Sequence, residues 1–272
     1  MKHNHLTKLL CIAGLLLAAQ TTHAAEDACT TQVESAIKRA YPSAKRTGDD
    51  YKINGARIQL SEAASPHAVV CRTWPAHPEL TLMAVPLIQK EDEGTNEGDL
   101  ELFVLDSSNA TTIRQRLRLP GRMSDDAVRI TSVSFDTARY QVAPGQTAFG
   151  LRITKEHNSR AIPFGETGLW LYTFDGNQLK PVLNGIVVDQ YQGEWDSDCA
   201  GTSKQTHRTL ATTSTARNSY VDITVSESII STTGTLAKNG ECGTQETKRR
   251  STHRLMYDGK QYVVPKALAP LE

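Results

Sequence analysis

The sequence predicts a mostly β protein, either an antiparallel sandwich or a small, incomplete propeller, with one short helix near the N-terminus. Two observations predict the strands. Apolar residues alternate with a period of two over much of the chain, and Gly, Asn, Asp and Pro interrupt these runs. Asn54-Gly55, Asp175-Gly176 and Asp258-Gly259 are typical of tight hairpins. A third observation, helical spacing of apolar residues, predicts a helix at residues 31–41.

The first 24 residues have the features of a secretory signal peptide. Lys2 and Lys8 come before or at the start of an apolar run from Leu9 to Ala19, and small residues lead up to Ala24. The run is shorter than the roughly 20 residues that cross a bilayer, so we expect no membrane span. We therefore expect a periplasmic or secreted protein, with cleavage of the signal near Ala24.

The helix is predicted by a start signal, a repeat and a stop. Thr31 and Glu34 have the S/T-x-x-E spacing of a capping box. Val33, Ala36, Ile37 and Ala40 then recur at helical spacing, and Pro42 ends the run.

Short strands follow the helix. "YKINGARIQL" predicts a hairpin around Asn54-Gly55, and "HAVVCRTW" and "ELTLMAVPLI" read as further strands. We assign residues 25–90 to a subdomain made of the helix and this hairpin.

Residues 90–99, "KEDEGTNEGD", contain no apolar side chain before Leu100. This composition predicts a loop or linker at a domain boundary. Residues 99–272 then read as an antiparallel β domain, which could also form one domain with residues 25–90.

The strand "LWLYTF" shows how alternation assigns faces. Leu169 and Leu171 fall on one face and Trp170 and Tyr172 on the other, so we expect a central strand that is covered on both sides. The Asp-Gly hairpins recur at irregular spacing, and a Greek-key sandwich and an incomplete propeller both suit this pattern.

Charge argues against a nucleic-acid partner. The chain of 272 residues has 30 basic and 30 acidic residues, and loss of Lys2 and Lys8 with the signal leaves the basic residues two fewer than the acidic ones. Phosphate binding needs concentrated Lys and Arg, and "TKRRSTHR" is the only basic cluster. We interpret that cluster as a solvated patch beside a strand.

Of the five cysteines, Cys11 leaves with the signal, and Cys29, Cys71, Cys199 and Cys242 remain. An even number in an exported chain predicts disulfides. Four cysteines allow three pairings, and we favour Cys29–Cys71 and Cys199–Cys242 because they join neighbours along the chain. The chain has no C-x-x-C spacing, so we expect no redox centre, no zinc ribbon and no cofactor.

The stretch "GEWDSDCAGTSKQTHR", residues 193–208, predicts a long polar surface loop held by a disulfide at Cys199. Loops on a rigid β scaffold often carry recognition. We therefore name Trp195, Asp196, Asp198 and His207 as candidate binding residues. In a second interpretation, Trp195 packs against the protein's own surface.

Motif searches give no catalytic assignment. G-x-S-x-G, H-E-x-x-H and Walker patterns are absent from the sequence. Asp196, Asp198 and Gly201 match an EF-hand loop, but Ala200 and His207 stand where ligands are needed. We assign no metal site, and an irregular calcium site is a weak alternative, with the ligands Asp189, Glu194, Asp196 and Asp198.

These observations predict an exported, non-enzymatic envelope protein that binds another macromolecule. The partner is a protein or a cell-wall glycan, and an inhibitor or immunity-type protein would fit. The alternative is an envelope glycan or peptidoglycan hydrolase that uses the carboxylates near Trp195 as acid and base. A structural component that adds strands edge to edge is a third candidate.

Overall fold

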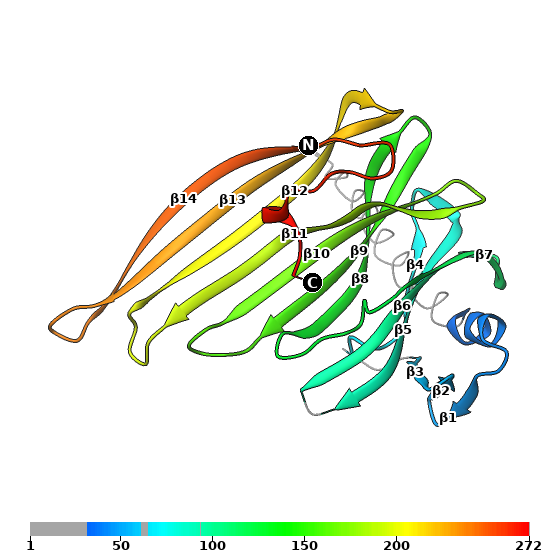
Figure 1. Cartoon of the computed structure of the whole chain (residues 1–272), viewed down its shortest axis with the longest axis horizontal. Coiled ribbons are helices and arrows are strands. Elements are labelled where there is room, and N and C mark those ends of the chain that lie inside the picture. Colours follow the sequence, from blue (N-terminus) through cyan, green and yellow to red (C-terminus); the bar gives the residue numbers. More distant parts are fainter. Residues whose placement is uncertain (1–31, 61–64, 93, 272) are drawn as a thin grey trace, which may run out of the picture.

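The computed structural model describes residues 32–60, 65–92 and 94–271. In these ranges, fourteen strands form two antiparallel sheets of seven strands each, with one short helix at residues 32–40 (Figure 1). The mostly β class, the sandwich alternative and the helix are confirmed, and the strands are not arranged as propeller blades. The proposed signal peptide, Cys29 and Thr31 lie outside the described residues.

The first sheet has the order β1-β2-β3-β5-β6-β7, and β4 pairs with β5 beside this path. Its strands are β1 (Lys45–Thr47), β2 (Asp50–Ile53), β3 (Ala56–Gln59), β4 (Val70–Trp74), β5 (His77–Asp92), β6 (Thr95–Asp106) and β7 (Asn109–Leu119).

The second sheet is a meander in which each strand pairs with its neighbour along the chain. The Greek-key expectation is therefore wrong for this sheet. A C-terminal segment with a short 3-10 helix, η1 (Lys266–Leu268), follows the last strand. The strands are β8 (Arg129–Ala143), β9 (Gln146–His157), β10 (Phe164–Phe174), β11 (Leu179–Trp195), β12 (Gly201–Arg217), β13 (Tyr220–Leu236) and β14 (Cys242–Leu255).

The helix packs on the first sheet through the face that the sequence predicts. Val33, Ala36 and Ile37 are buried in a cluster that includes Met83 and Phe103 of that sheet. Among the described residues, no helix combines the length and the apolar character needed to cross a membrane.

The hairpin between β2 and β3 is also confirmed. Its two turn residues, Asn54 and Gly55, have φ angles of 48° and 83°. Positive φ at both positions belongs to the type I′ turn, whose twist matches that of paired strands and which favours Asn-Gly.

The two sheets share one apolar core. Trp74, Leu82 and Leu102 of the first sheet lie in the same buried cluster as Phe149 and Tyr172 of the second. The Phe149 ring lies 5.2 Å from the Trp74 ring and 5.7 Å from the Tyr172 ring, between centroids. Aromatic contacts of this kind add to the free energy gained by burying the rings.

Strand β10 confirms the assignment of faces in "LWLYTF". Trp170 and Tyr172 belong to the core between the sheets. Leu169 and Leu171 belong to a second cluster, which also contains Tyr262 of the C-terminal segment. All four side chains are buried, as expected for a strand covered on both sides.

The prediction of a loop or linker at residues 90–99 is wrong. β5 runs to Asp92 and β6 begins at Thr95, so the segment forms the end of a hairpin. Its polar composition reflects exposure, because β5 extends past the core after Ile88 and its last four residues are exposed. The first sheet continues through β7 to Leu119, well inside the range assigned to the second domain.

We predict that Phe149→Ala lowers the free energy of unfolding by about 3–5 kcal/mol, because Phe149 is 1% exposed at the centre of the core between the sheets. Ser132→Ala, at an exposed position of β8, should change it by less than about 0.5 kcal/mol. Urea denaturation of the two variants measures both values. Equal effects would contradict the assignment of this core.

Candidate functional site

The stretch at residues 193–208 is a hairpin, so the prediction of a long loop is wrong. β11 continues through Trp195, residues 196–200 form the turn, and β12 begins at Gly201. Alternation of apolar and polar residues did not predict these strands, because both of their faces carry polar residues.

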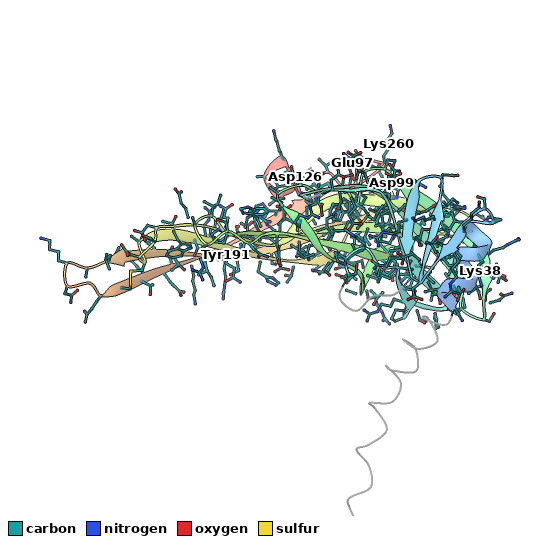
Figure 2. The ribbon with its side chains drawn as sticks, turned by 90° about the horizontal axis from the view of Figure 1, so that it is seen from below. Lys38, Glu97, Asp99, Asp126, Tyr191 and Lys260 are labelled. Atoms are coloured by element: carbon teal, nitrogen blue, oxygen red, sulfur yellow. A yellow bond between two sulfur atoms is a disulfide. The ribbon has the colours of Figure 1, made fainter. Side chains whose placement is uncertain are left out.

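The hairpin belongs to an extension of the second sheet that we call the wing, residues 189–207 and 228–250. Pairing in this region is continuous from β11 across β12 and β13 to β14. Figures 1 and 2 show the wing reaching away from the first sheet, with side chains on both of its faces. The wing is therefore a single sheet layer.

The register assigns side chains to the two faces of the wing, because successive residues of a strand point to opposite sides. One face carries the two aromatic residues of the wing, and we call it the aromatic face. Tyr191 is 38% exposed there. The residues of this face include Asp189, Tyr191, Trp195, Gln205, His207, Ile230, Leu236, Lys248 and Arg250.

Trp195 lies across three glycines of the aromatic face. A Cβ atom added at Gly193, Gly201 or Gly234 would lie within 2.8 Å of an indole atom. The three glycines stand on β11, β12 and β13, so their missing side chains make room for the flat ring. Trp195 is half-buried against these glycines, which agrees with the interpretation that it packs against the protein's own surface.

His207 and Asp189 face each other across β11 and β12 on the aromatic face. The Nδ1 atom of His207 lies 2.5 Å from Oδ1 of Asp189, and both side chains are about half exposed. A carboxylate only accepts, so Nδ1 donates this hydrogen bond. The structure thus brings the candidate residues Trp195 and His207 onto one face, together with Asp189.

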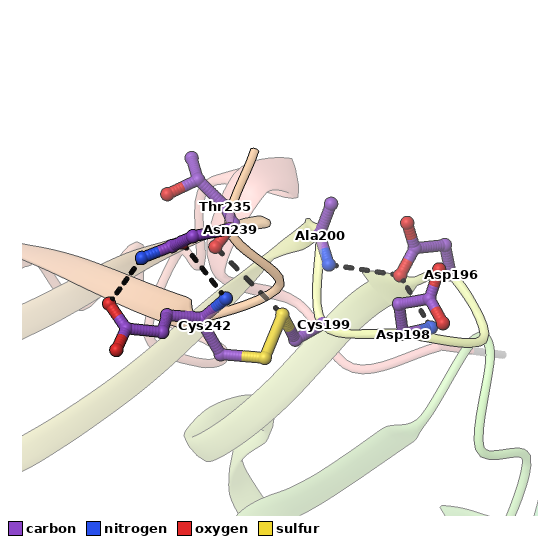
Figure 3. The surroundings of a disulfide bond; sticks show 8 residues. Asp196, Asp198, Cys199, Ala200, Thr235, Asn239 and Cys242 are labelled. Carbon is purple, nitrogen blue, oxygen red and sulfur yellow. Dashed lines mark hydrogen bonds between the residues drawn. A yellow bond between two sulfur atoms is a disulfide. The ribbon is translucent and has the colours of Figure 1, made fainter. Parts of the chain in front are cut away.

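The turn that follows Trp195 is held by Asp196. Its Oδ1 atom accepts hydrogen bonds from the backbone N–H groups of Asp198, at 3.0 Å, and Ala200, at 2.9 Å (Figure 3). This carboxylate therefore shapes the turn, and Asp198 is exposed beside it.

The disulfide between Cys199 and Cys242 is formed, as predicted (Figure 3). It joins the β11–β12 turn to the start of β14, with the two Cα atoms 6.0 Å apart. The bond therefore links one hairpin of the wing to the next. The partner predicted for Cys71 is Cys29, which lies outside the described residues, so that pairing stays a prediction.

The carboxylates named for calcium binding or hydrolysis are dispersed. Asp189 and Glu194 project from opposite faces of β11, as the register shows. Within the described ranges, no three His, Cys, Asp or Glu side chains form a group that could hold a metal ion.

A buried ion pair lies where the wing joins the body of the sheet. Arg208 on β12 donates to Glu227 on β13 at 2.7 Å, and Arg208 also donates to the Val187 carbonyl of β11 at 2.9 Å. Ser251 on β14 donates to the other oxygen of Glu227 at 2.5 Å. One carboxylate and one guanidinium thus connect four strands.

The pKa of Glu227 reflects these contacts. Burial by itself would raise the pKa, but the hydrogen bonds from Ser251 and Arg208 outweigh burial and lower the pKa to about 2. The carboxylate is therefore charged in the folded protein at neutral pH.

β14 forms an edge of the second sheet, and among the described strands it pairs only with β13. Lys248, Arg249 and Arg250 are exposed on this strand. In the part of the chain that the structure describes, none of the three forms an ion pair. The basic cluster interpreted as a patch beside a strand is thus part of the edge strand itself.

Tyr191, Ile230 and Leu236 of the aromatic face were not predicted as binding residues from the sequence. In "DQYQGEW", Tyr191 and Trp195 do alternate with polar residues, and this signal could have identified the end of β11. β12 has no comparable signal, because "TSKQTH" contains no apolar residue.

We predict that low pH destabilises the part of the second sheet where the wing joins its body. Because the folded-state pKa of Glu227 is depressed from an ordinary 4.5 to about 2, its contribution to stability is present above pH 4.5 and is lost as the pH falls towards 2. Glu227→Gln should flatten the dependence of unfolding free energy on pH in this interval. Glu246→Gln, a change at an exposed position of β14, should leave the pH dependence of the unfolding free energy as it is in the wild type.

We predict that the Cys199→Ser, Cys242→Ser double variant opens the wing. The bond spans 43 residues, and closing such a loop stabilises the folded state by about 4 kcal/mol in the chain-entropy model. Amides of β13 and β14 should exchange with solvent faster, whereas those of β9 and β10 keep their protection. Hydrogen exchange measures both sets, and unchanged exchange in β14 would show that the bond does not hold the wing.

Comparison with known proteins gives no function for the wing. Comparison of the chain with protein-family models, with curated proteins and with solved structures gave no match. The proposal below therefore depends on the geometry of this chain.

Proposed function

We propose that this protein is an exported, non-enzymatic protein of the cell envelope that binds another macromolecule through the wing. The observation that carries the proposal is a single sheet layer with two solvent-facing sides, which is held in shape by the Cys199–Cys242 disulfide and the Arg208–Glu227 ion pair. Export is supported by the sequence features of residues 1–24 and by the disulfide.

The aromatic face favours a protein as the partner. It combines exposed Tyr191 and Leu236 with half-buried Ile230, and charged groups surround them. Protein interfaces commonly have aromatic and aliphatic anchors inside a polar rim. Asp189 and His207 offer polar contacts close to Tyr191.

The basic edge of β14 gives the partner a second contact. Edge strands expose unpaired backbone groups, and an extended segment of another chain can add to them. Lys248, Arg249 and Arg250 would favour a segment with acidic residues and disfavour pairing between copies of this edge. We therefore expect an acidic partner surface, and the same edge is what an assembly component would use.

A cell-wall glycan is the second candidate, because a half-buried indole lying flat on a sheet suits contact with a sugar ring. Hydrolysis by the nearby carboxylates has less support, since Asp189 and Glu194 stand on opposite faces and Asp196 accepts the hydrogen bonds of its own turn.

We predict that Tyr191→Glu abolishes capture of the partner from envelope extract, because it replaces an exposed aromatic side chain of the aromatic face with a charge. Gln192→Glu is the matched control. It introduces the same charge one residue away, at an exposed position of the opposite face, and should capture as the wild type does. Thermal unfolding checks that both variants fold.

The identity of the captured molecule separates the candidates. A protein lost with Tyr191→Glu and kept with Gln192→Glu supports the proposal, and a glycan with the same pattern supports the second candidate. If both variants capture the same molecules as the wild type, the aromatic face is not the binding surface.

A further inference from the structure

A cavity of about 920 Å³ lies away from the wing, where the two sheets and the C-terminal segment meet. Its walls come from the β5–β6 hairpin, the connection at residues 120–128, strands β9, β10 and β11, and residues 269–271. Glu97 and Asp126, which line it, lie on the same side of the molecule in Figure 2. This volume lies within the range of small-molecule sites, roughly 300–1,000 Å³.

The ring of Trp170 lies against the side chain of Arg122 in the wall of this cavity. A Cβ atom at Gly168 or Gly185 would lie 2.5 or 2.7 Å from the indole, so the ring lies closely over both glycines. The guanidinium carbon of Arg122 is 4.4 Å from the centre of the same ring. This cation–π contact holds Arg122 in place but leaves its charge without a counter-ion.

Among the described residues, the guanidinium group of Arg122 has no hydrogen-bond or ion-pair partner. Its Nε atom is buried and has no hydrogen-bond partner, and no described carboxylate pairs with its guanidinium. Buried donors are normally satisfied, so such an atom at a cavity wall indicates a missing acceptor. An anionic group in the cavity would supply that acceptor and the counter-ion together.

Asn96 adds an unsatisfied acceptor to the same cavity. It is 2% exposed, and its Nδ2 atom donates to Oδ1 of Asp125 at 2.9 Å. Its Oδ1 atom is buried and has no partner among the described residues. A ligand that satisfies Asn96 must therefore carry a donor, such as a hydroxyl group.

The acidic residues of the wall are mostly engaged within the protein. Asp125 accepts the hydrogen bond from Asn96 and a second one from the Ile130 backbone N–H at 2.7 Å. It also lies 3.6 Å from Arg129. Glu97 lies 3.7 Å from Lys90.

Two further charged residues line the cavity. Asp126 is exposed and accepts a hydrogen bond from the backbone of Val128. Lys155 is half-buried opposite Glu166 in the register, but no ion pair joins it to a described carboxylate. It can therefore assist Arg122.

We propose that this cavity binds a small acidic saccharide or a ligand of the same chemistry: a hydroxylated ring that carries one anionic group. The anionic group, a carboxylate or a phosphate, pairs with Arg122 and approaches Lys155, and a hydroxyl donates to Oδ1 of Asn96. The site is independent of the wing and of its partner.

Calorimetric titration of the full mature chain tests the proposal with three probes: glucuronate, glucose 6-phosphate and glucose. At least one acidic sugar should bind with a Kd below about 10 mM, and glucose at least about tenfold more weakly. The stronger acidic probe identifies the anion as carboxylate or phosphate. Failure of both acidic sugars to bind, or equal binding of glucose, would overturn the proposal.

Two variants locate the site. Arg122→Gln should weaken binding of the acidic probe at least about tenfold, because a charge-assisted hydrogen bond is lost, and Arg122→Lys should recover part of it. Arg139→Gln removes the same charge at an exposed position of β8 outside the cavity and should bind normally. Wild-type affinity in a folded Arg122→Gln variant would refute the assignment.

Discussion

Contact between the two sheets is the constraint on which the rest of this structure depends. Trp74, Phe149 and Tyr172 lie at the centre of a core to which both sheets contribute. Burial of apolar area is the main driving force of folding, so this contact fixes how the sheets face each other. It covers only part of the second sheet, whose strands β11, β12 and β13 have 17 residues each. The outer parts of these strands must be held by other interactions.

The wing shows which interactions stabilise a sheet beyond the core between the two layers. At its base, Arg208 and Glu227 are both buried and satisfied by neighbouring strands, which limits the desolvation cost of the ion pair. Towards its tip, the wing is held by the Cys199–Cys242 disulfide, which stabilises the folded state by lowering the entropy of the unfolded chain. The ring of Trp195 also covers the backbone at three glycines. Backbone pairing across four strands connects these points. A sheet built in this way keeps both faces free for a partner.

The wing and the cavity differ in the kind of ligand that each suits. The aromatic face of the wing is an open surface of exposed and half-buried side chains, as large partners require. The cavity is concave and has fixed polar groups, Arg122 on Trp170 and the buried Asn96, as small ligands require. Occupation of one would leave the other open, because the cavity is lined by residues outside the wing.

The sequence by itself determined the elements with a local signature: the helix predicted at 31–41 and found at 32–40, the Asn54-Gly55 turn and the two buried faces of β10. It favoured the pairing of Cys199 with Cys242 among three possible pairings, and the structure forms that bond. Each follows from apolar periodicity, from a backbone conformation that few residues adopt, or from closeness along the chain. Tertiary structure decided that 90–99 and 193–208 belong to hairpins, because these solvated strand ends carry little apolar alternation and form by pairing with a neighbour already in place. It also decided which distant residues meet. Arg122 reaches Trp170, and Tyr191 joins Ile230 on one face, only after strands far apart in the chain have been placed side by side.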